Sequence, residues 1–247
     1  GGAAARCGQR GGEAGEGCLP LGWEGGGGGG GRGEVRMGGR RAEGTARGLV
    51  VLLHGVGGNG QSLAGVAQAL DPRLHVLVPR GPLVFGPQAF GWFTVRFGAQ
   101  GPVIDPAQAE QSRLLLGEWL AAQQERLGVG ARQTVLAGFS QGGIMSASVA
   151  LTQPQRVKSF GVLCGRILPE IAPHVPADIA DAGLDGLLVH GHADDKLPYT
   201  LAESAAARLQ ALGVAHQLRG YPVGHTLSAD MQRDISGWIQ QRLLSLP

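Results

Sequence analysis

Ser140 lies in a stretch whose residue types suit a nucleophile. The segment Gly138-Phe139-Ser140-Gln141-Gly142 follows a short apolar run and precedes small and apolar residues, so we expect a strand, an abrupt turn and a helix. Glycines two residues before and after the serine allow so tight a turn. The N-terminus of the following helix then points free N–H groups at the place where negative charge develops during attack on an ester. This context favours a nucleophilic serine over a serine that only caps a glycine-rich turn.

Two further residues complete a set that would activate Ser140. Asp194 follows the apolar run 186–189, and His225 lies between a last short strand and the final helix. A carboxylate in this position binds a ring N–H of the histidine and sets its tautomer, and the histidine then accepts the serine proton. We expect Asp194 rather than the adjacent Asp195 to reach His225, because consecutive side chains project in different directions.

A metal-dependent interpretation of the same stretch is an alternative. His190, His192 and Asp194 have the H-x-H-x-D spacing of metallo-β-lactamase-type hydrolases, but Asp195 stands where that motif needs a histidine. No other cluster of His or Cys supplies the remaining ligands at close spacing. The sequence therefore favours a site without metal or cofactor. A metallohydrolase using His190, His192 and Asp194 is the less favoured alternative.

The glycine-rich loop from Gly55 to Ser62 allows two interpretations. It nearly fits the phosphate-binding pattern G-x-x-x-x-G-K-[ST], but Gln61 replaces the lysine whose charge would meet the phosphates. The loop also follows the continuous apolar run 48–55, which predicts a strand buried in a parallel sheet. A loop in that position can present a backbone N–H to an oxyanion. We assign the two oxyanion donors to the N–H groups of Val56 and Gln141.

Alternating strand and helix patterns surround these residues. We expect strands at 48–55, 75–79, 134–139, 159–165, 186–189 and 216–221, and helices at 62–70, 105–127, 141–152, 198–212 and 227–243. This alternation predicts one α/β domain with a mostly parallel sheet. The Pro-rich loop 166–185 is too short for a large cap domain, so the active site should be open.

The segment 83–97 is the candidate binding surface. Together with the turn before it, it holds four of the six phenylalanines and one of the four tryptophans, and its Gly and Pro residues argue against a regular element. Aromatic side chains there either seal the end of the sheet or line an apolar pocket above the strand ends. The candidates for contact with an acyl tail are Phe85, Phe90, Trp92 and Phe93.

Composition limits the other function classes. Residues 1–47 are dominated by Gly with Arg, Glu and Ala, so we expect a disordered leader before a folded domain at 48–247. A net charge of +2 without a basic stripe gives no reason to expect a nucleic-acid partner. No apolar run approaches the roughly 20 residues of a membrane span. The odd number of widely spaced cysteines, Cys7, Cys18 and Cys164, favours a reducing, cytoplasmic compartment.

The motifs together resemble a known family. Four segments are similar to motifs of the phospholipase/carboxylesterase family, which includes acyl-protein thioesterases: Leu53 to Gly57, Gly138 to Gly143, His190 to Pro198, and Gly224-His225. The resemblance extends from about residue 48 to the C-terminus, and Gly91-Trp92-Phe93 resembles the family's Trp-Phe motif. The sequence departs from the family at Cys164, where a serine is common, and at Thr94, where the family has an aspartate.

The resemblance implies an α/β-hydrolase fold, with a mostly parallel sheet flanked by helices, and a serine esterase or thioesterase. Ser140, Asp194 and His225 follow the chain order of that fold. The implied substrates are small acyl esters or thioesters of short to medium chains, acylated proteins or lysophospholipids. A non-catalytic binding protein on the same fold is the alternative from another class. The oligomeric state is open, with a homodimer as one option.

Overall fold

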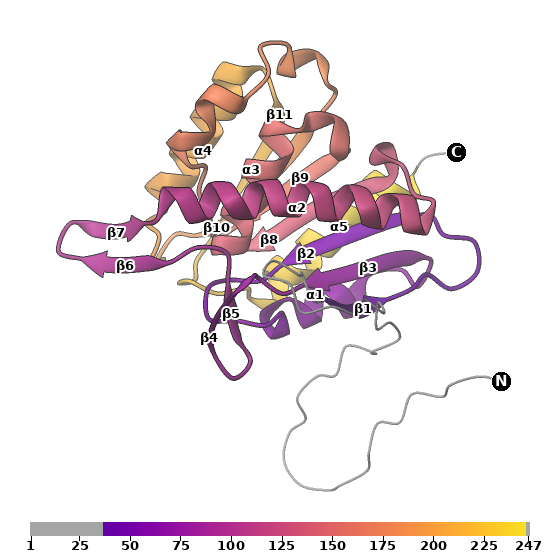
Figure 1. Cartoon of the computed structure of the whole chain (residues 1–247), viewed down its shortest axis with the longest axis horizontal. Helices are drawn as coiled ribbons and strands as arrows, with labels where there is room; N and C mark the ends of the chain where they lie inside the picture. The colour runs from indigo at the N-terminus through magenta and orange to yellow at the C-terminus, as the bar shows by residue number, and fades with distance from the viewer. Residues whose placement is uncertain (1–36, 246–247) are drawn as a thin grey trace, which may run out of the picture.

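The structure, a computed structural model, describes residues 37–245. A twisted sheet of seven strands forms the centre of this domain (Figure 1). The strand order is β1-β3-β2-β8-β9-β10-β11. In chain order these strands are β1 (Met37–Arg40), β2 (Gly48–Leu53), β3 (Leu74–Pro79), β8 (Thr134–Phe139), β9 (Ser159–Leu163), β10 (Asp185–Gly191) and β11 (Ala215–Tyr221). Strand β1 runs antiparallel to β3, and all other neighbouring pairs are parallel, as predicted.

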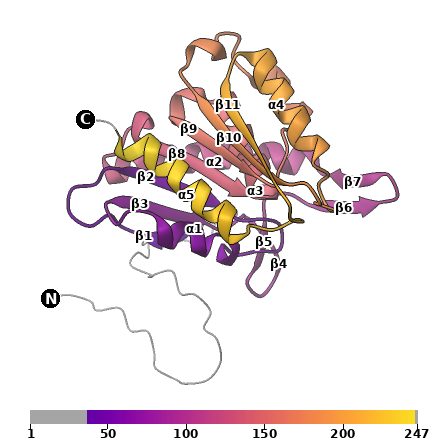
Figure 2. The same ribbon diagram turned by 180° about the vertical axis from the view of Figure 1, so that it is seen from behind.

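Helices cover both faces of this sheet, because side chains along each central strand alternate between two apolar clusters. Leu49, Val51 and Leu53 of β2 pack with residues of α2 and α3, which cross the near face in Figure 1. Val50 and Leu52 pack with residues of α1 and α5, which cross the opposite face in Figure 2. The helices are α1 (Ala64–Ala69), α2 (Pro106–Leu127), α3 (Gln141–Thr152), α4 (Thr200–Leu212) and α5 (Ala229–Leu244). Short 3₁₀ turns complete the elements: η1 (Gln61–Leu63), η2 (Ala131–Gln133), η3 (Pro154–Arg156), η4 (Pro169–His174) and η5 (Ile179–Asp181).

Helix α2 begins and ends where the sequence predicts. The Asp105 side chain accepts hydrogen bonds from the N–H groups of Ala107 and Gln108, which have no carbonyl partner inside the helix. Gly128 follows the last turn in the left-handed conformation, at φ 65°, which glycine adopts without steric cost.

The domain begins earlier than the expected boundary at residue 47. Strand β1 pairs with β3 over four residues, and Arg40 donates hydrogen bonds to the carbonyls of Leu70 at 2.8 Å and Asp71 at 3.1 Å. Gly39, at φ 147°, lies so close to β3 that a Cβ atom would stand 2.1 Å from the carbonyl oxygen of Val76. Residues 37–47 therefore belong to the folded domain. The rest of the expected leader, residues 1–36, lies outside the described residues.

Removal of residues 37–47 should lower the melting temperature by about 5–10 °C. Loss of the β1 ladder and of the Arg40 hydrogen bonds should cost a few kcal/mol, and each kcal/mol shifts the melting temperature of a domain of this size by about 2–4 °C. The measurement is thermal unfolding of a chain that starts at Gly48 against a control that starts at Met37. Equal melting temperatures would contradict a stabilising role for β1.

The aromatic segment forms two hairpins, so the expectation of an irregular loop was wrong. Strand β4 (Leu83–Gly86) pairs with β5 (Ala89–Gly91), and β6 (Val95–Gly98) pairs with β7 (Gly101–Ile104). Both hairpins extend from the body of the domain (Figure 1). Several of the glycine and proline residues that argued against regular structure lie at the ends of these strands or in the turns between them.

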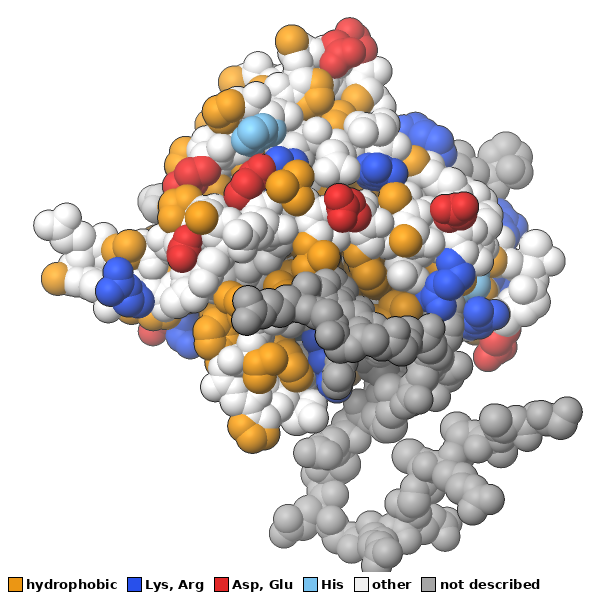
Figure 3. Space-filling model, in the orientation of Figure 1, with side chains coloured by type: hydrophobic (Ala, Val, Ile, Leu, Met, Phe, Trp, Pro, Cys, Tyr) orange, Lys and Arg blue, Asp and Glu red, His pale blue; other side chains and the backbone are white. Residues whose placement is uncertain are grey.

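The surface of the described residues carries charges of both signs. On the face in Figure 3, acidic and basic side chains are interspersed, and a continuous basic stripe does not cross it. Among residues 37–245, every helix is too short or too polar to cross a bilayer.

Candidate active site

Ser140 occupies a strained turn between β8 and α3. Its backbone has φ 55° and ψ −118°, a conformation that residues with a side chain seldom adopt. Gly138 and Gly142 make the turn possible, because a Cβ on Gly138 would lie 2.3 Å from the Gly142 backbone and a Cβ on Gly142 would lie 2.1 Å from the Leu53 carbonyl oxygen. The Ser140 N–H donates to the carbonyl of Leu163 at 2.7 Å. The turn therefore holds the serine above the ends of the central strands, as its glycine spacing predicted.

A chain of hydrogen bonds connects the three side chains that the sequence singled out. Nε2 of His225 lies 2.9 Å from Oγ of Ser140, and Nδ1 of His225 lies 2.6 Å from Oδ2 of Asp194. Asp194 is fully buried at its side chain, whereas Asp195 is exposed. When Nδ1 donates its proton to the carboxylate, Nε2 is left as an acceptor facing the serine hydroxyl.

The loop after β10 orients the Asp194 carboxylate. Its Oδ1 atom accepts the N–H groups of Lys196 at 3.0 Å and Leu197 at 2.8 Å, so that Oδ2 faces His225. His190 donates from Nε2 to the carbonyl of Leu197 at 2.7 Å and so holds the same loop. His190 therefore has a structural role.

The three side chains of the metal alternative do not form a ligand set. The Nε2 atom of His190 bonds the Leu197 carbonyl, and the His192 ring packs against Tyr199 with centroids 4.3 Å apart. Within residues 37–245, His, Cys, Asp and Glu side chains form no group of three that converges as metal ligands do. The Asp194 carboxylate is directed to His225 instead.

Val56 and Gln141, whose N–H groups the sequence assigns to the oxyanion, both lie near Ser140. Gln141 is the first residue of α3, a position whose N–H has no acceptor within its own helix. Val56 follows β2 in the loop where Gly55 packs against the serine, since a Cβ on Gly55 would lie 3.4 Å from Cβ of Ser140. Val56, Gln141 and Ser140 border one cavity. The two residues assigned to the oxyanion thus lie on the cavity that holds Ser140.

Comparison with known proteins places the chain in a family. The model of the Phospholipase/Carboxylesterase family matches residues 40–243. The chain belongs to this family. Acyl-protein thioesterase 1 of Emericella nidulans is 25% identical over 184 residues, which cover 67% of this chain and 77% of that protein. The probable carboxylesterase SOBER1-like of Arabidopsis thaliana is 23% identical, with 83% of each chain covered.

Solved structures share the fold of this family member. The crystal structure of esterase PE8 matches with a TM-score of 0.72 at 28% identity and covers 85% of this chain and 100% of its own. The carboxylesterase of Bacillus cereus matches with a TM-score of 0.71 at 20% identity and covers 84% of this chain and 94% of its own. The resemblance, the α/β-hydrolase fold without a large cap and the class of carboxylic ester hydrolase are thereby confirmed.

A buried network connects Gln141 of this ester hydrolase to the two residues that follow its first hairpin. The Gln141 side chain accepts the N–H groups of Trp92 at 2.6 Å and Phe93 at 3.3 Å, and it donates to the Phe93 carbonyl at 2.8 Å. From the sequence, only the backbone N–H of Gln141 is assigned a role. A buried glutamine beside the serine was the available signal, because a buried amide requires partners.

His54 holds the loop that carries Val56. Its Nε2 atom accepts the N–H of Gly81 at 2.9 Å, so Nδ1 carries the proton and donates to the Gly55 carbonyl at 2.6 Å. Burial lowers the pKa of the His54 imidazole, which keeps the ring neutral for this pair of bonds. The indole N–H of Trp92 donates to the His54 carbonyl at 2.9 Å. His54 and Trp92 are therefore structural supports of the loop.

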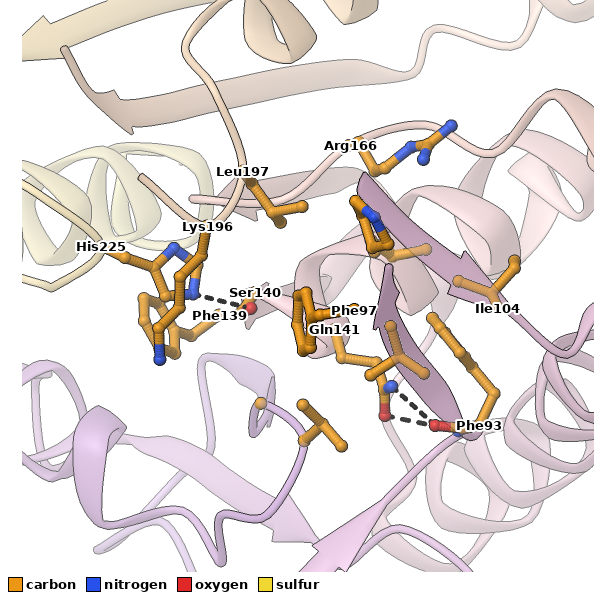
Figure 4. A pocket seen from close by; sticks show the side chains of 15 residues that line it. Phe93, Phe97, Ile104, Phe139, Ser140, Gln141, Arg166, Lys196, Leu197 and His225 are labelled. Atoms are coloured by element: carbon orange, nitrogen blue, oxygen red, sulfur yellow. Dashed lines mark hydrogen bonds between the residues drawn. The ribbon is translucent and has the colours of Figure 1, made fainter. Parts of the chain in front are cut away.

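A cavity of about 310 Å³ opens beside Ser140 and His225 (Figure 4). Its apolar walls come largely from the second hairpin and from the ends of the central elements: Phe93, Val95, Phe97, Pro102, Ile104, Phe139, Ile144 and Leu197. Two cationic side chains, Arg166 and Lys196, also line it. The volume is at the lower end of the range for small-molecule sites.

Only one of the four predicted binding residues lines this cavity. Phe93 does so, but Trp92 is fully buried against His54, and Phe85 is 48% exposed on the first hairpin. Phe90 lies on β5, where its backbone pairs with Gly58. The assignment of Phe85, Phe90 and Trp92 is thus corrected, because the first hairpin packs on the glycine loop while the second borders the cavity. The spacing of Val95 and Phe97, two residues apart, was the sequence signal that both side chains lie on one face of a strand.

Cys164 is a buried structural residue. Burial raises the pKa of its thiol to about 12, and Sγ lies 3.5 Å from the carbonyl oxygen of Thr226. A thiol with so high a pKa is not ionised near neutral pH, which removes it as a competing nucleophile. Cys7 and Cys18 lie outside the described residues.

Proposed function

We propose that the chain hydrolyses carboxylic esters or thioesters through Ser140, His225 and Asp194. The observation that carries the proposal is the pair of hydrogen bonds, 2.9 Å from Ser140 to His225 and 2.6 Å from His225 to Asp194, beside a mostly apolar cavity. The curated relatives named as a carboxylesterase and an acyl-protein thioesterase support the same chemistry.

The proposed reaction has two steps. Oγ of Ser140 attacks the carbonyl carbon while Nε2 of His225 takes the hydroxyl proton, and Asp194 stabilises the resulting imidazolium. The N–H groups of Val56 and Gln141 bind the oxyanion, and His225 returns the proton to the departing alcohol or thiol. A water molecule then attacks the acyl-enzyme by the same route, which releases the carboxylic acid and regenerates Ser140. No metal or cofactor takes part in either step.

A fluorophosphonate probe tests the proposal, because it forms a covalent bond with an activated serine. We expect labelling of Ser140 in the wild-type chain, none in Ser140→Ala, and esterase activity that a chelator does not reduce. Activity that the chelator abolishes, without labelling, would support a metallohydrolase instead. Neither labelling nor hydrolysis of any ester would support the non-catalytic binding protein.

Short to medium acyl chains fit the cavity best. Burial of each methylene contributes about 0.8 kcal/mol, so kcat/KM should rise roughly threefold to fourfold per added carbon. The rise should stop at medium chains, since the cavity holds only about 310 Å³. The measurement is kcat/KM over a series of unbranched neutral esters.

Ile104→Ala should flatten this dependence on chain length and spare acetate esters, whose tails are too short to fill the cavity. Phe85→Ala is the matched control, because Phe85 is exposed on the other hairpin and is absent from the cavity lining. An equal loss for all chain lengths in Ile104→Ala would mean that the second hairpin acts only by sealing the domain.

A further inference from the structure

Arg166 lines the cavity beside Ser140 without a protein partner. Its Nε atom is buried and has no hydrogen-bond partner in the described part of the chain. None of the ion pairs within residues 37–245 includes Arg166. A partly buried guanidinium with a water-excluded Nε therefore lies in the wall of the cavity, and Figure 4 shows it directed away from Ser140.

Other arginines of the domain that are withdrawn from water have partners. Arg113 bonds Glu110 and also Oγ1 of Thr152 at 2.9 Å, and Arg242 bonds Asp185 at 2.7 Å. Desolvation of an unpaired cation is unfavourable, so proteins pair most buried charges or expose them to a ligand. The position of Arg166 in the cavity wall indicates that its missing acceptor comes from a ligand.

The geometry of the proposed reaction decides which part of a substrate would reach Arg166. The departing group must face Nε2 of His225, which gives it a proton, and the oxyanion must face Val56 and Gln141. The acyl substituent occupies the remaining direction. In Figure 4 His225 and Lys196 lie on one side of Ser140, and Arg166 and Ile104 lie on the other. The acyl chain therefore runs toward Arg166, and the leaving group lies on the side of Lys196.

We propose that Arg166 binds a carboxylate at the far end of the acyl chain. This inference rests on the proposed function and names its substrate class: monoesters or monothioesters of short dicarboxylic acids. A guanidinium presents parallel N–H donors that match the two oxygens of a carboxylate. The apolar walls at Phe97 and Ile104 contact the methylenes between the two carboxyl groups. Hydrolysis consumes one water and yields the free dicarboxylate and the alcohol or thiol.

If the anion were instead the phosphate of a lysophospholipid, its binding would depend on a different cation of the cavity. That anion belongs to the leaving group, so it would lie on the side of Lys196 and not of Arg166. The two cations of the cavity thus distinguish two kinds of substrate: Arg166 would bind an anion on the acyl chain, and Lys196 an anion on the leaving group.

The test compares two esters with the same para-nitrophenol leaving group. One is the monoester of adipic acid, and the other is the ester of a branched acid in which an isopropyl end replaces the carboxylate. The measured quantity is the ratio of their kcat/KM values, charged over neutral. Arg166→Met should lower this ratio about tenfold to a hundredfold, mainly through KM, as expected for loss of a charge-assisted hydrogen bond. Arg166→Lys should give an intermediate ratio.

Lys196→Met is the matched control, since it removes a cation from the same cavity on the opposite side of Ser140. It should change the ratio much less than Arg166→Met does. An equal fall of the ratio in both variants would overturn the subsite. It would mean that the overall positive charge of the cavity, and not Arg166 itself, attracts the anion. An unchanged ratio in Arg166→Met would overturn the subsite directly. The subsite would also be overturned if the enzyme preferred an anionic substrate only in the comparison of lysophosphatidic acid with monoacylglycerol, and if only Lys196→Met removed that preference.

Failure of this inference is distinct from failure of the proposed function. Hydrolysis of the neutral ester together with probe labelling of Ser140 reports the function alone. If both occur while the ratio does not respond to Arg166→Met, only the carboxylate subsite is wrong. If neither occurs, the function is wrong and the subsite is refuted with it. Thermal unfolding of each variant verifies folding, and Arg166→Gln serves in place of Arg166→Met if the latter is unstable.

Discussion

Ser140→Ala should lower kcat for ester hydrolysis by about 10⁵-fold to 10⁶-fold. The Oγ atom at 2.9 Å from Nε2 of His225 is the only atom of the proposed site that forms the acyl-enzyme, and alanine offers nothing in its place. The residual rate should come from the oxyanion donors and from substrate binding, which do not need the serine hydroxyl. Steady-state hydrolysis of a para-nitrophenyl ester measures the loss.

The double variant Ser140→Ala with His225→Ala tests whether the residues act as one unit. Once the nucleophile is absent, the base has no proton to accept, so the second substitution should add little. Losses that multiply would mean that His225 works independently of Ser140. Ser146→Ala is the matched serine control, because Ser146 is buried in α3, the helix that follows Ser140, and its hydroxyl donates to the Gly142 carbonyl at 3.0 Å. It should retain near wild-type kcat.

The sequence predicts which residues meet at the site, because parallel strands bring their carboxyl ends to one edge of a sheet. Ser140, Asp194 and His225 each follow a different strand, β8, β10 and β11, and the order of these strands places the three loops together. What the sequence does not provide is the orientation of the carboxylate. That depends on the N–H groups of Lys196 and Leu197 and on the bond from His190, which are features of a folded loop.

The elements that the sequence missed have weak local patterns. Strand β1 has the sequence Met-Gly-Gly-Arg, which shows no alternation, and its pairing depends on the close approach of Gly39 to β3 and on the Arg40 hydrogen bonds across 30 residues of chain. The prediction of the residues that line the cavity failed for a similar reason. The aromatic residues of 83–97 are close in sequence, but they lie on two consecutive hairpins. Both Phe85 and Phe97 are exposed, and only Phe97 borders the cavity.

Asp194→Asn should lower kcat by about 10⁴-fold, the second largest effect that we expect. Two backbone N–H groups, from Lys196 and Leu197, point at the Oδ1 position, so an asparagine must place its amide oxygen there. Its NH₂ group then faces Nδ1 of His225, which becomes the acceptor. The imidazole proton moves to Nε2, where it blocks acceptance of the Ser140 proton. Steady-state kcat for the same ester measures this loss.

Asp195→Asn is the matched control, because it makes the same chemical change at an exposed neighbour and should leave kcat within a few-fold of the wild type. The two variants together also test the tautomer argument. Asp194→Ala removes the carboxylate without offering an NH₂ group, so His225 would keep a mixture of tautomers and lose less kcat than in Asp194→Asn. A larger loss in Asp195→Asn than in Asp194→Asn would transfer the acid to the adjacent residue. Equal losses in Asp194→Asn and Asp194→Ala would show that charge, rather than the position of the ring proton, is what Asp194 supplies.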